Sequence, residues 1–321
     1  MSSGFTSLLI IAVGAQLALQ APINSALGQH VGKLAASFVS FLIGTSILLI
    51  LVFVSGGAGS LSALGDVPAY QLAGGLIGAT YVATATFTVA RIGAGAVVAA
   101  TITGQLLSSL AIDDFGLVGV DAVALDGIRI LGALMLLGGT LLVVGQGKPA
   151  KEEPAGQKPA ARVPAGQKPG GSRVQWRAEL PSIAAVFGAG LLVGFQHPLN
   201  GLLSESAGEL GAGLTNFLVG TSFLLFLVLV TGRGPKLAGV RGAPAWQFLG
   251  GLIGVITVAA ALSAVSVVGA AGLTAALVTG QLLGSVLIDR AGAFGLPVRL
   301  LTARRLVGTM LLLAGTAACV S

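Results

Sequence analysis

Side-chain amides within apolar stretches are the residues of this sequence best suited to bind a polar solute. Gln16, Gln20 and Asn24 are spaced by four residues, so on a helix they share one face. Gln196 and Asn200 repeat the last two members of this set further along the chain. An unpaired amide in hydrocarbon costs several kcal/mol, so we expect all five to face the protein interior.

A proline lies between the paired amides in both stretches, at Pro22 and Pro198. Because proline lacks a backbone N–H, the carbonyls of Ala18 and Gly194, one turn earlier, lose their helical partner. Free carbonyls beside amides would make a polar binding surface for a small substrate. The alternative is a hydrogen-bonded network that joins transmembrane helices near a proline kink.

Four further residues extend the candidate binding set. Gln105 and Gln281 lie slightly past the middle of two later apolar stretches, and Tyr81 lies in the middle of another. His197 can titrate near neutral pH, which favours proton coupling; alternatively it is a neutral, hydrogen-bonded histidine. Tyr81 either lines a cavity or packs against neighbouring side chains. Two polar layers are predicted to flank one central cavity, an inner layer of Gln20, Asn24 and Gln281 and an outer layer of Gln196, Asn200 and Gln105.

Two pairs of opposite charge have the same sixteen-residue spacing, Asp113 with Arg129 and Asp289 with Arg305. Each pair stands where one apolar stretch ends and the next begins. This placement indicates a structural ion pair that ties adjacent helix ends, with a coupling carboxylate as the alternative. Arg91 begins a tight connection and is expected to anchor the chain at the membrane surface, or to act in a gate.

Catalytic motifs are missing from the sequence. We find no Gly-rich phosphate loop, no cluster of metal ligands and no serine or cysteine triad. Two histidines are too few for most metal sites. We therefore expect no enzyme activity, no metal and no cofactor, with H⁺ or Na⁺ as the candidate coupling ion.

Composition places these residues in a membrane. Of the 321 residues 55% are hydrophobic and 9% are charged, and the mean hydropathy is +0.96. A soluble domain of this size needs far more charge to cover its surface. The sequence therefore predicts an all-α integral membrane protein, because helices satisfy the backbone in lipid. Ten stretches are long and apolar enough to span a bilayer: roughly 5–27, 34–54, 69–90, 92–112, 128–146, 182–203, 210–231, 245–267, 269–288 and 303–320.

The basic residues determine the predicted orientation. With the N-terminus outside, every Lys and Arg except Arg129 falls in a cytoplasmic loop, as the positive-inside rule requires. Residues 147–178, the one long hydrophilic stretch, then form a cytoplasmic linker whose Pro, Gly and Lys content indicates flexibility. Both termini are expected outside. The net charge of +6 comes from these loops and does not indicate nucleic-acid binding.

The two sides of the linker repeat each other at a constant offset of 176 residues. Five spans are an odd number, so the second repeat (179–321) must enter the membrane from the opposite side to the first (1–146). Inverted repeats are typical of secondary transporters, because exchanging the conformations of the two halves opens one site to either side. The matching motifs are Gln-x-Pro-x-Asn at 20–24 and 196–200, Phe-Leu-x-Gly-Thr-Ser at 41–46 and 217–222, Gly-Gly-Leu-Ile-Gly at 74–78 and 250–254, and Thr-Gly-Gln-Leu-Leu at 103–107 and 279–283.

These motifs resemble the YdcZ family of inner-membrane exporters, in the drug/metabolite transporter superfamily. The resemblance covers both repeats and everything except the linker. It implies the ten-helix fold of that superfamily, in a fused form, because relatives resembling one half occur as separate five-span chains. It implies no particular substrate.

The sequence thus predicts a secondary transporter that exports a small polar or amphiphilic metabolite by alternating access. A flippase of a lipid-linked substrate with the same fold is one alternative, and a non-transporting membrane enzyme or assembly subunit is another. The expected partners are the substrate and membrane lipid. We expect no obligate protein partner, so the chain would act as a monomer.

Overall fold

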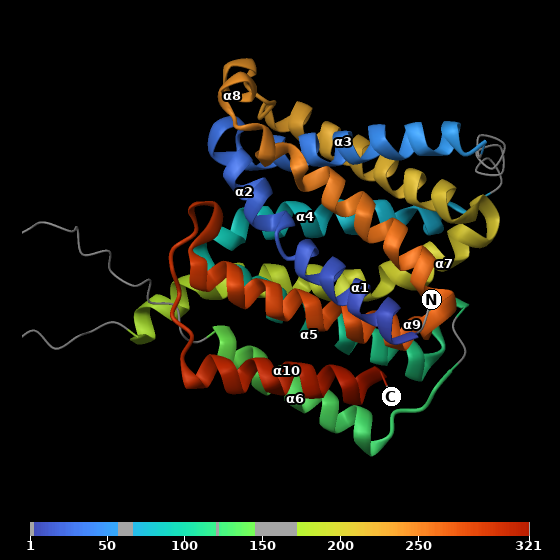
Figure 1. Cartoon of the computed structure of the whole chain (residues 1–321), viewed down its shortest axis with the longest axis vertical. Coiled ribbons are helices and arrows are strands. Elements are labelled where there is room, and N and C mark those ends of the chain that lie inside the picture. The colour runs from blue at the N-terminus through green and yellow to red at the C-terminus, as the bar shows by residue number, and fades with distance from the viewer. Residues whose placement is uncertain (1–2, 57–66, 120–121, 145–171, 321) are drawn as a thin grey trace, which may run out of the picture.

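The structure, a computed structural model, describes residues 3–56, 67–119, 122–144 and 172–320. Within these ranges the only regular elements are helices, which confirms the all-α class. The helices lie side by side in one bundle, with both chain termini at one end and the start of α7 (Ser172–Thr231) at the other (Figure 1). We call the first end the terminal face and the second end the linker face.

The described part of the first repeat contains six α-helices and two short 3-10 turns: α1 Ser3–Leu17, α2 Gln20–Val31, α3 Lys33–Val54, η2 Ala69–Leu72, α4 Ala73–Ile92, α5 Ala94–Phe115, η3 Leu117–Gly119 and α6 Gly127–Val144. The second repeat contains α7, α8 Leu237–Gly242, η4 Ala245–Leu249, α9 Gly250–Ala291, η5 Ala293–Gly295 and α10 Ala303–Val320. Residues 147–171 of the predicted linker lie outside the described residues, and α7 begins at Ser172, within the segment predicted as linker.

Eight helices among the described residues are long and apolar enough to cross a membrane. One of them, Ala178–Thr231, is 54 residues long. It contains two of the predicted spans, because the chain reverses at Gly208, which has φ 67° and ψ 167°. Its counterpart Gly32, with φ 92° and ψ 143°, makes the matching reversal between α2 and α3. The total of ten spans stays a prediction.

The first predicted span is found as one apolar segment, Gly4–Val31, built from two successive helices. The chain breaks at Ala18 and Leu19, between α1 and α2. The Leu19 N–H donates to the Gln16 carbonyl at 3.0 Å, a tightened turn. Pro22 has no N–H to offer the Ala18 carbonyl, which weakens the helix at this point and permits the break. Pro198, at the equivalent position, lies inside α7 without such an interruption.

Equivalent residues of the two repeats face each other between α3 and the later part of α7. The hydroxyls of Thr45 and Thr221 form a 2.8 Å hydrogen bond. The rings of Phe41 and Phe217 lie 5.1 Å apart between centroids. These pairs differ by the repeat offset, so a pseudo-twofold axis passes between α3 and α7.

Glycines bring the helices of the two repeats close together in matching pairs. A Cβ atom at Gly14 would overlap the backbone of Leu277, and one at Gly190 would overlap the backbone of Thr101. α1 therefore packs on the later part of α9 as the early part of α7 packs on α5. α6 and α10 form a third pair at one side of the bundle (Figure 1), in contact through Gly139 and Gly308. Such small-residue contacts are typical of membrane helices.

Candidate functional site

The paired amides of the first repeat contact the glycine motif of the second. Gln20 Nε2 donates to the Gly250 carbonyl at 3.0 Å. A Cβ at Gly250 would overlap Asn24 Oδ1, and one at Gly254 would lie 3.2 Å from Gln20 Nε2. Asn24 is 0% exposed, and neither of its amide atoms has a hydrogen-bond partner among the described residues.

The amides of the second repeat make the mirror contacts on the first. A Cβ at Gly74 would overlap Asn200 Oδ1, and one at Gly78 would lie 2.9 Å from Gln196 Nε2. Asn216 Nδ2 donates to Asn200 Oδ1 at 2.8 Å. These four amides thus join α2 to α9 and α7 to α4. Their placement favours the helix-packing interpretation over direct substrate binding.

The remaining predicted pair of glutamines lies in two different environments. Gln105 Nε2 and His197 Nε2 are 2.9 Å apart and share a hydrogen bond between α5 and α7. At the equivalent place in the other repeat, Gln281 meets Ala21 instead of a histidine. There Gln281 and Tyr81 line a small cavity with Leu17, Ala18, Ala21, Pro22, Val89, Ala94, Val97 and Val98. Five helices, α1, α2, α4, α5 and α9, meet around this cavity, at the break between α1 and α2.

Gln16 lines a much larger cavity of about 480 Å³ between α1 and α9. Its other lining residues are apolar except for one threonine: Thr6, Leu9, Ile10, Ala12, Val13, Ala260, Ala264 and Val267. The cavity lies at the terminal face, because α1 begins there (Figure 1). Leu9 and Val267, at 44% and 45% exposed, border its mouth. An apolar space with one amide suits a small solute that is partly hydrophobic.

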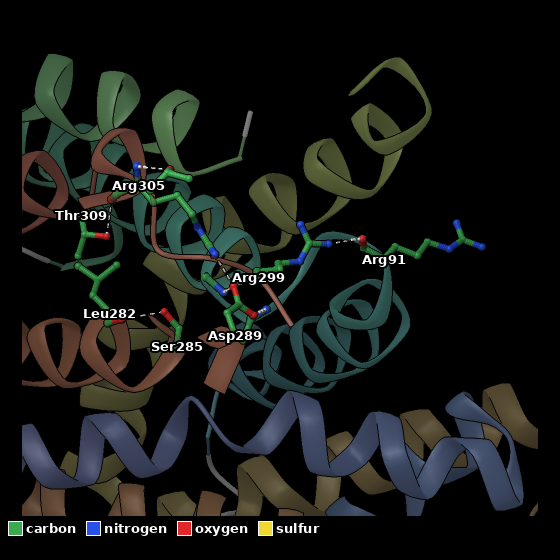
Figure 2. A network of polar contacts seen from close by, with 10 residues as sticks. Arg91, Leu282, Ser285, Asp289, Arg299, Arg305 and Thr309 are labelled. Carbon is green, nitrogen blue, oxygen red and sulfur yellow. Dashed lines mark hydrogen bonds and ion pairs between the residues drawn. The ribbon is translucent and has the colours of Figure 1, made fainter. Parts of the chain in front are cut away.

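Among the described residues, Asp289 forms an extensive polar cluster at the linker face (Figure 2). Its carboxylate accepts hydrogen bonds from the backbone N–H groups of Ala94 and Gly95, at 2.7 and 3.1 Å, and pairs with the Arg305 guanidinium. Asp289 is 0% exposed. It therefore caps the N-terminus of α5, where the free N–H groups and the helix dipole favour a negative charge.

Arg299 completes the cluster from the connection between α9 and α10. Its Nη2 donates to the Arg91 carbonyl at 2.8 Å. Burial lowers the pKa of Arg299 from its ordinary value, while the carboxylates of Asp289 and Glu179 act in the opposite direction. The Arg91 side chain itself points away from the cluster (Figure 2), so Arg91 takes part through its backbone only.

Asp113 and Arg129 form the equivalent pair at the terminal face, but more loosely. Asp113 Oδ2 lies 3.8 Å from Arg129 Nη1, and the Asp113 side chain is 35% exposed. The backbone around both aspartates is the same: Val123 N–H donates to the Asp113 carbonyl and Arg299 N–H to the Asp289 carbonyl, each at 2.8 Å. Val123 therefore stands where the other repeat has Arg299.

Several contributing residues were missed from sequence. Arg299 lies outside the sixteen-residue spacing, and its counterpart Val123 is apolar. Comparison of the two repeats therefore did not single out Arg299. Ser40 and Asn216 are equivalent polar residues, each beside the amides of its own repeat, and that match could have flagged both. The glycine motifs were found as repeat matches only, and the structure shows that each receives a particular pair of amides.

Comparison with known proteins agrees with this geometry. The family described as "Putative inner membrane exporter, YdcZ" matches residues 5–142 and again 181–318. The two matched segments keep the repeat offset and together cover most of the chain. The protein belongs to the YdcZ family. Its resemblance to this family, its multi-pass character and its inner-membrane location are thereby confirmed.

Two individual proteins extend the comparison. Inner membrane protein YdcZ of Escherichia coli (strain K12) is 32% identical over 139 residues, which are 42% of this chain and 91% of that protein. One repeat therefore has about the length of the whole bacterial relative. A protein solved by crystallography, 16% identical, matches with a TM-score of 0.59 over 99% of this chain and 96% of its own. That likeness shows a shared fold.

Proposed function

We propose that this YdcZ-family protein is a secondary transporter that exports a small polar or amphiphilic metabolite by alternating access. The observation that carries the proposal is the contact of equivalent residues across the pseudo-twofold axis, Thr45 with Thr221 and Phe41 with Phe217. Two repeats related in this way can exchange conformations, and the exchange moves the opening of one central site from one face to the other.

The substrate path begins in the cavity beside Gln16. The next two residues, Leu17 and Ala18, line the smaller cavity that also holds Tyr81 and Gln281. In this proposal a solute enters or leaves through the large cavity and reaches Gln281 when the helices around the small cavity separate. With the predicted orientation, the large cavity faces outside. H⁺ or Na⁺ coupling, with His197 as the titratable candidate, belongs to the same proposal.

A flippase of a lipid-linked substrate is the second candidate. Leu9 and Val267 at the mouth of the large cavity are both exposed, and Leu9 belongs to a helix segment that is long and apolar enough to cross a membrane, Gly4–Val31. A lipid tail could therefore remain in the bilayer while a polar group enters the cavity. This lateral access favours a flippase over a strictly aqueous path.

Transport by purified protein in proteoliposomes tests the proposal. We would screen a metabolite panel with and without a pH or Na⁺ gradient, using the wild type, Gln281→Ala and Gln16→Ala. Gln29→Ala is the matched control, since Gln29 is exposed at the linker-face end of α2. We expect flux in the wild type and the control, and at least a roughly tenfold loss with Gln281→Ala, the size of one lost polar contact of about 1.4 kcal/mol.

Other outcomes decide between the candidates. Flux that survives both substitutions keeps the transporter but moves the site away from these glutamines. Transfer of a labelled lipid-linked substrate without metabolite flux favours the flippase. Absence of both activities contradicts the proposal and leaves a non-transporting membrane enzyme or assembly subunit.

A further inference from the structure

We infer that Asp289 and Asp113 are alternating latches, each closing one face of the protein by capping a helix of the opposite repeat. The inference rests on the proposed alternating access and names the residues that would control it. The linker-face latch consists of Asp289, Arg305 and Arg299 together with the N–H groups of Ala94 and Gly95. The terminal-face latch is the counterpart built on Asp113 and Arg129.

The linker-face latch joins the two repeats where a gate must act. Asp289 and Arg305 belong to the second repeat, whereas Ala94 and Gly95 begin α5 of the first. Gly93, with φ 86°, makes the sharp turn from α4 that presents these N–H groups. A Cβ at Gly95 would lie 2.8 Å from Arg305 Nη2 and 3.0 Å from Asp289 Oδ2, so the site admits no larger residue without movement.

The hydrogen bonds of this latch are strong because they join a charged carboxylate in a buried site. Charge-assisted hydrogen bonds to a fully buried carboxylate are about twice as strong as neutral ones. Opening the linker face would keep the Asp289–Arg305 pair, which lies within one repeat, but would remove the hydrogen bonds from the Ala94 and Gly95 N–H groups to the buried carboxylate, and leaving a buried charge under-satisfied is costly. The latch therefore holds the linker face closed in this structure, in agreement with the small cavity beneath Ala94.

The terminal face shows the complementary state. Asp113 is one-third exposed and its ion pair is long, and the 480 Å³ cavity opens between α1 and residues 260–267 of α9. By the repeat offset, Gly93–Ala94 correspond to Gly269–Ala270, which lie within α9 in this structure. When the repeats exchange conformations, Asp113 would cap the backbone there as Asp289 now caps α5. One face then closes as the other opens.

Thiol accessibility tests the latches without any substrate. In a Cys319→Ser background, Val13→Cys reports on the large cavity and Val98→Cys on the small one. The probe is a water-soluble maleimide applied to protein in nanodiscs. With an otherwise native latch we expect fast labelling at 13 and slow labelling at 98.

Asp289→Asn should reverse this pattern. We expect at least a roughly tenfold faster rate at 98 together with a slower rate at 13, since charge-assisted bonds are lost from one state only. Asp113→Asn should leave labelling at 13 fast and slow it further at 98. Glu205→Gln removes an equal charge from an exposed position at the terminal face and should change neither rate.

Unchanged rates in Asp289→Asn, or an equal rise at both positions, would overturn the inference, since an equal rise means general loosening. If Asp289→Asn does not fold, Gly95→Ala provides a milder opening of the same latch, and it must shift the two rates in the same opposed directions. Because labelling needs no solute, opposed shifts without transport support the latches and count against the transporter. Transport without opposed shifts supports the transporter and counts against the latches.

Discussion

Replacing Gly250 with alanine tests whether the amides hold the two repeats together. The new methyl group would overlap Asn24 Oδ1 and lie 2.9 Å from Ser40 Oγ. Both neighbours are buried, so neither can move into solvent. Overpacking of this kind costs about 1–3 kcal/mol, which at roughly 2 °C per kcal/mol lowers Tm by roughly 2–6 °C in a chain of this length.

The methyl group of Gly250→Ala would collide with the Asn24 side chain, and a second substitution can remove that side chain. Asn24→Ala shortens the side chain that the new methyl meets, and Asn24 makes no hydrogen bond among the described residues. We therefore expect the double variant Asn24→Ala/Gly250→Ala to recover most of the loss, with a coupling energy of about 1 kcal/mol or more. Thermal unfolding in detergent, followed by the loss of monodisperse protein, measures all three variants.

Gly138→Ala is the matched control for this experiment. Gly138 lies in α6, and a Cβ there meets nothing within 4 Å, so alanine should be neutral or stabilise the helix by up to about 1 kcal/mol. The reasoning is refuted if Gly250→Ala is as stable as Gly138→Ala. It is also refuted if Asn24→Ala gives no rescue, because the amide would then not be what the glycine accommodates.

Three further predictions use the same unfolding measurement or a close relative. Thr45→Val and Thr221→Val should each lower the free energy of unfolding by about 0.6–1.7 kcal/mol. The double variant should lose less than the sum, because the two hydroxyls share one hydrogen bond, and additive losses would contradict that contact. Gln105→Leu and His197→Leu should be non-additive for the same reason, with independent effects excluding the bond. Pro22→Ala restores an N–H toward Ala18, so hydrogen exchange at residues 18–22 should slow, and unchanged exchange would mean that packing makes the break.

The repeat was the most informative feature of the sequence, because a constant offset turns one motif into two positions in space. It predicted that Asp113 and Arg129 would pair as Asp289 and Arg305 do, and both pairs form. Polarity at helical spacing also predicted that Gln20 and Asn24 would avoid lipid, and both are buried. These conclusions need only periodicity and the cost of amides in hydrocarbon.

The direction in which those amides point could not be derived in this way. A polar helix face can line a cavity or meet a neighbouring helix, and the spacing is identical in both cases. The structure places Gln20 against Gly250 but leaves Gln16, on the same predicted face, beside a cavity. The break at Ala18 and Leu19 separates them, and the equivalent proline in α7 causes no break. The segments around Pro22 and Pro198 therefore differ in conformation although they share one sequence motif.

That difference follows from what an inverted repeat must do. If two equivalent segments always had the same conformation, both faces would be open or both closed, so any state that opens to one side needs asymmetry. Part of this asymmetry is fixed in the sequence. The second repeat has Arg299 where the first has Val123, and His197 where the first has Ala21. A single-repeat chain paired with an identical copy would carry the same latch at both faces. Fusion allows the linker-face latch to have one more guanidinium than its counterpart, and under the proposed alternating access this extra contact would favour the state closed at the linker face.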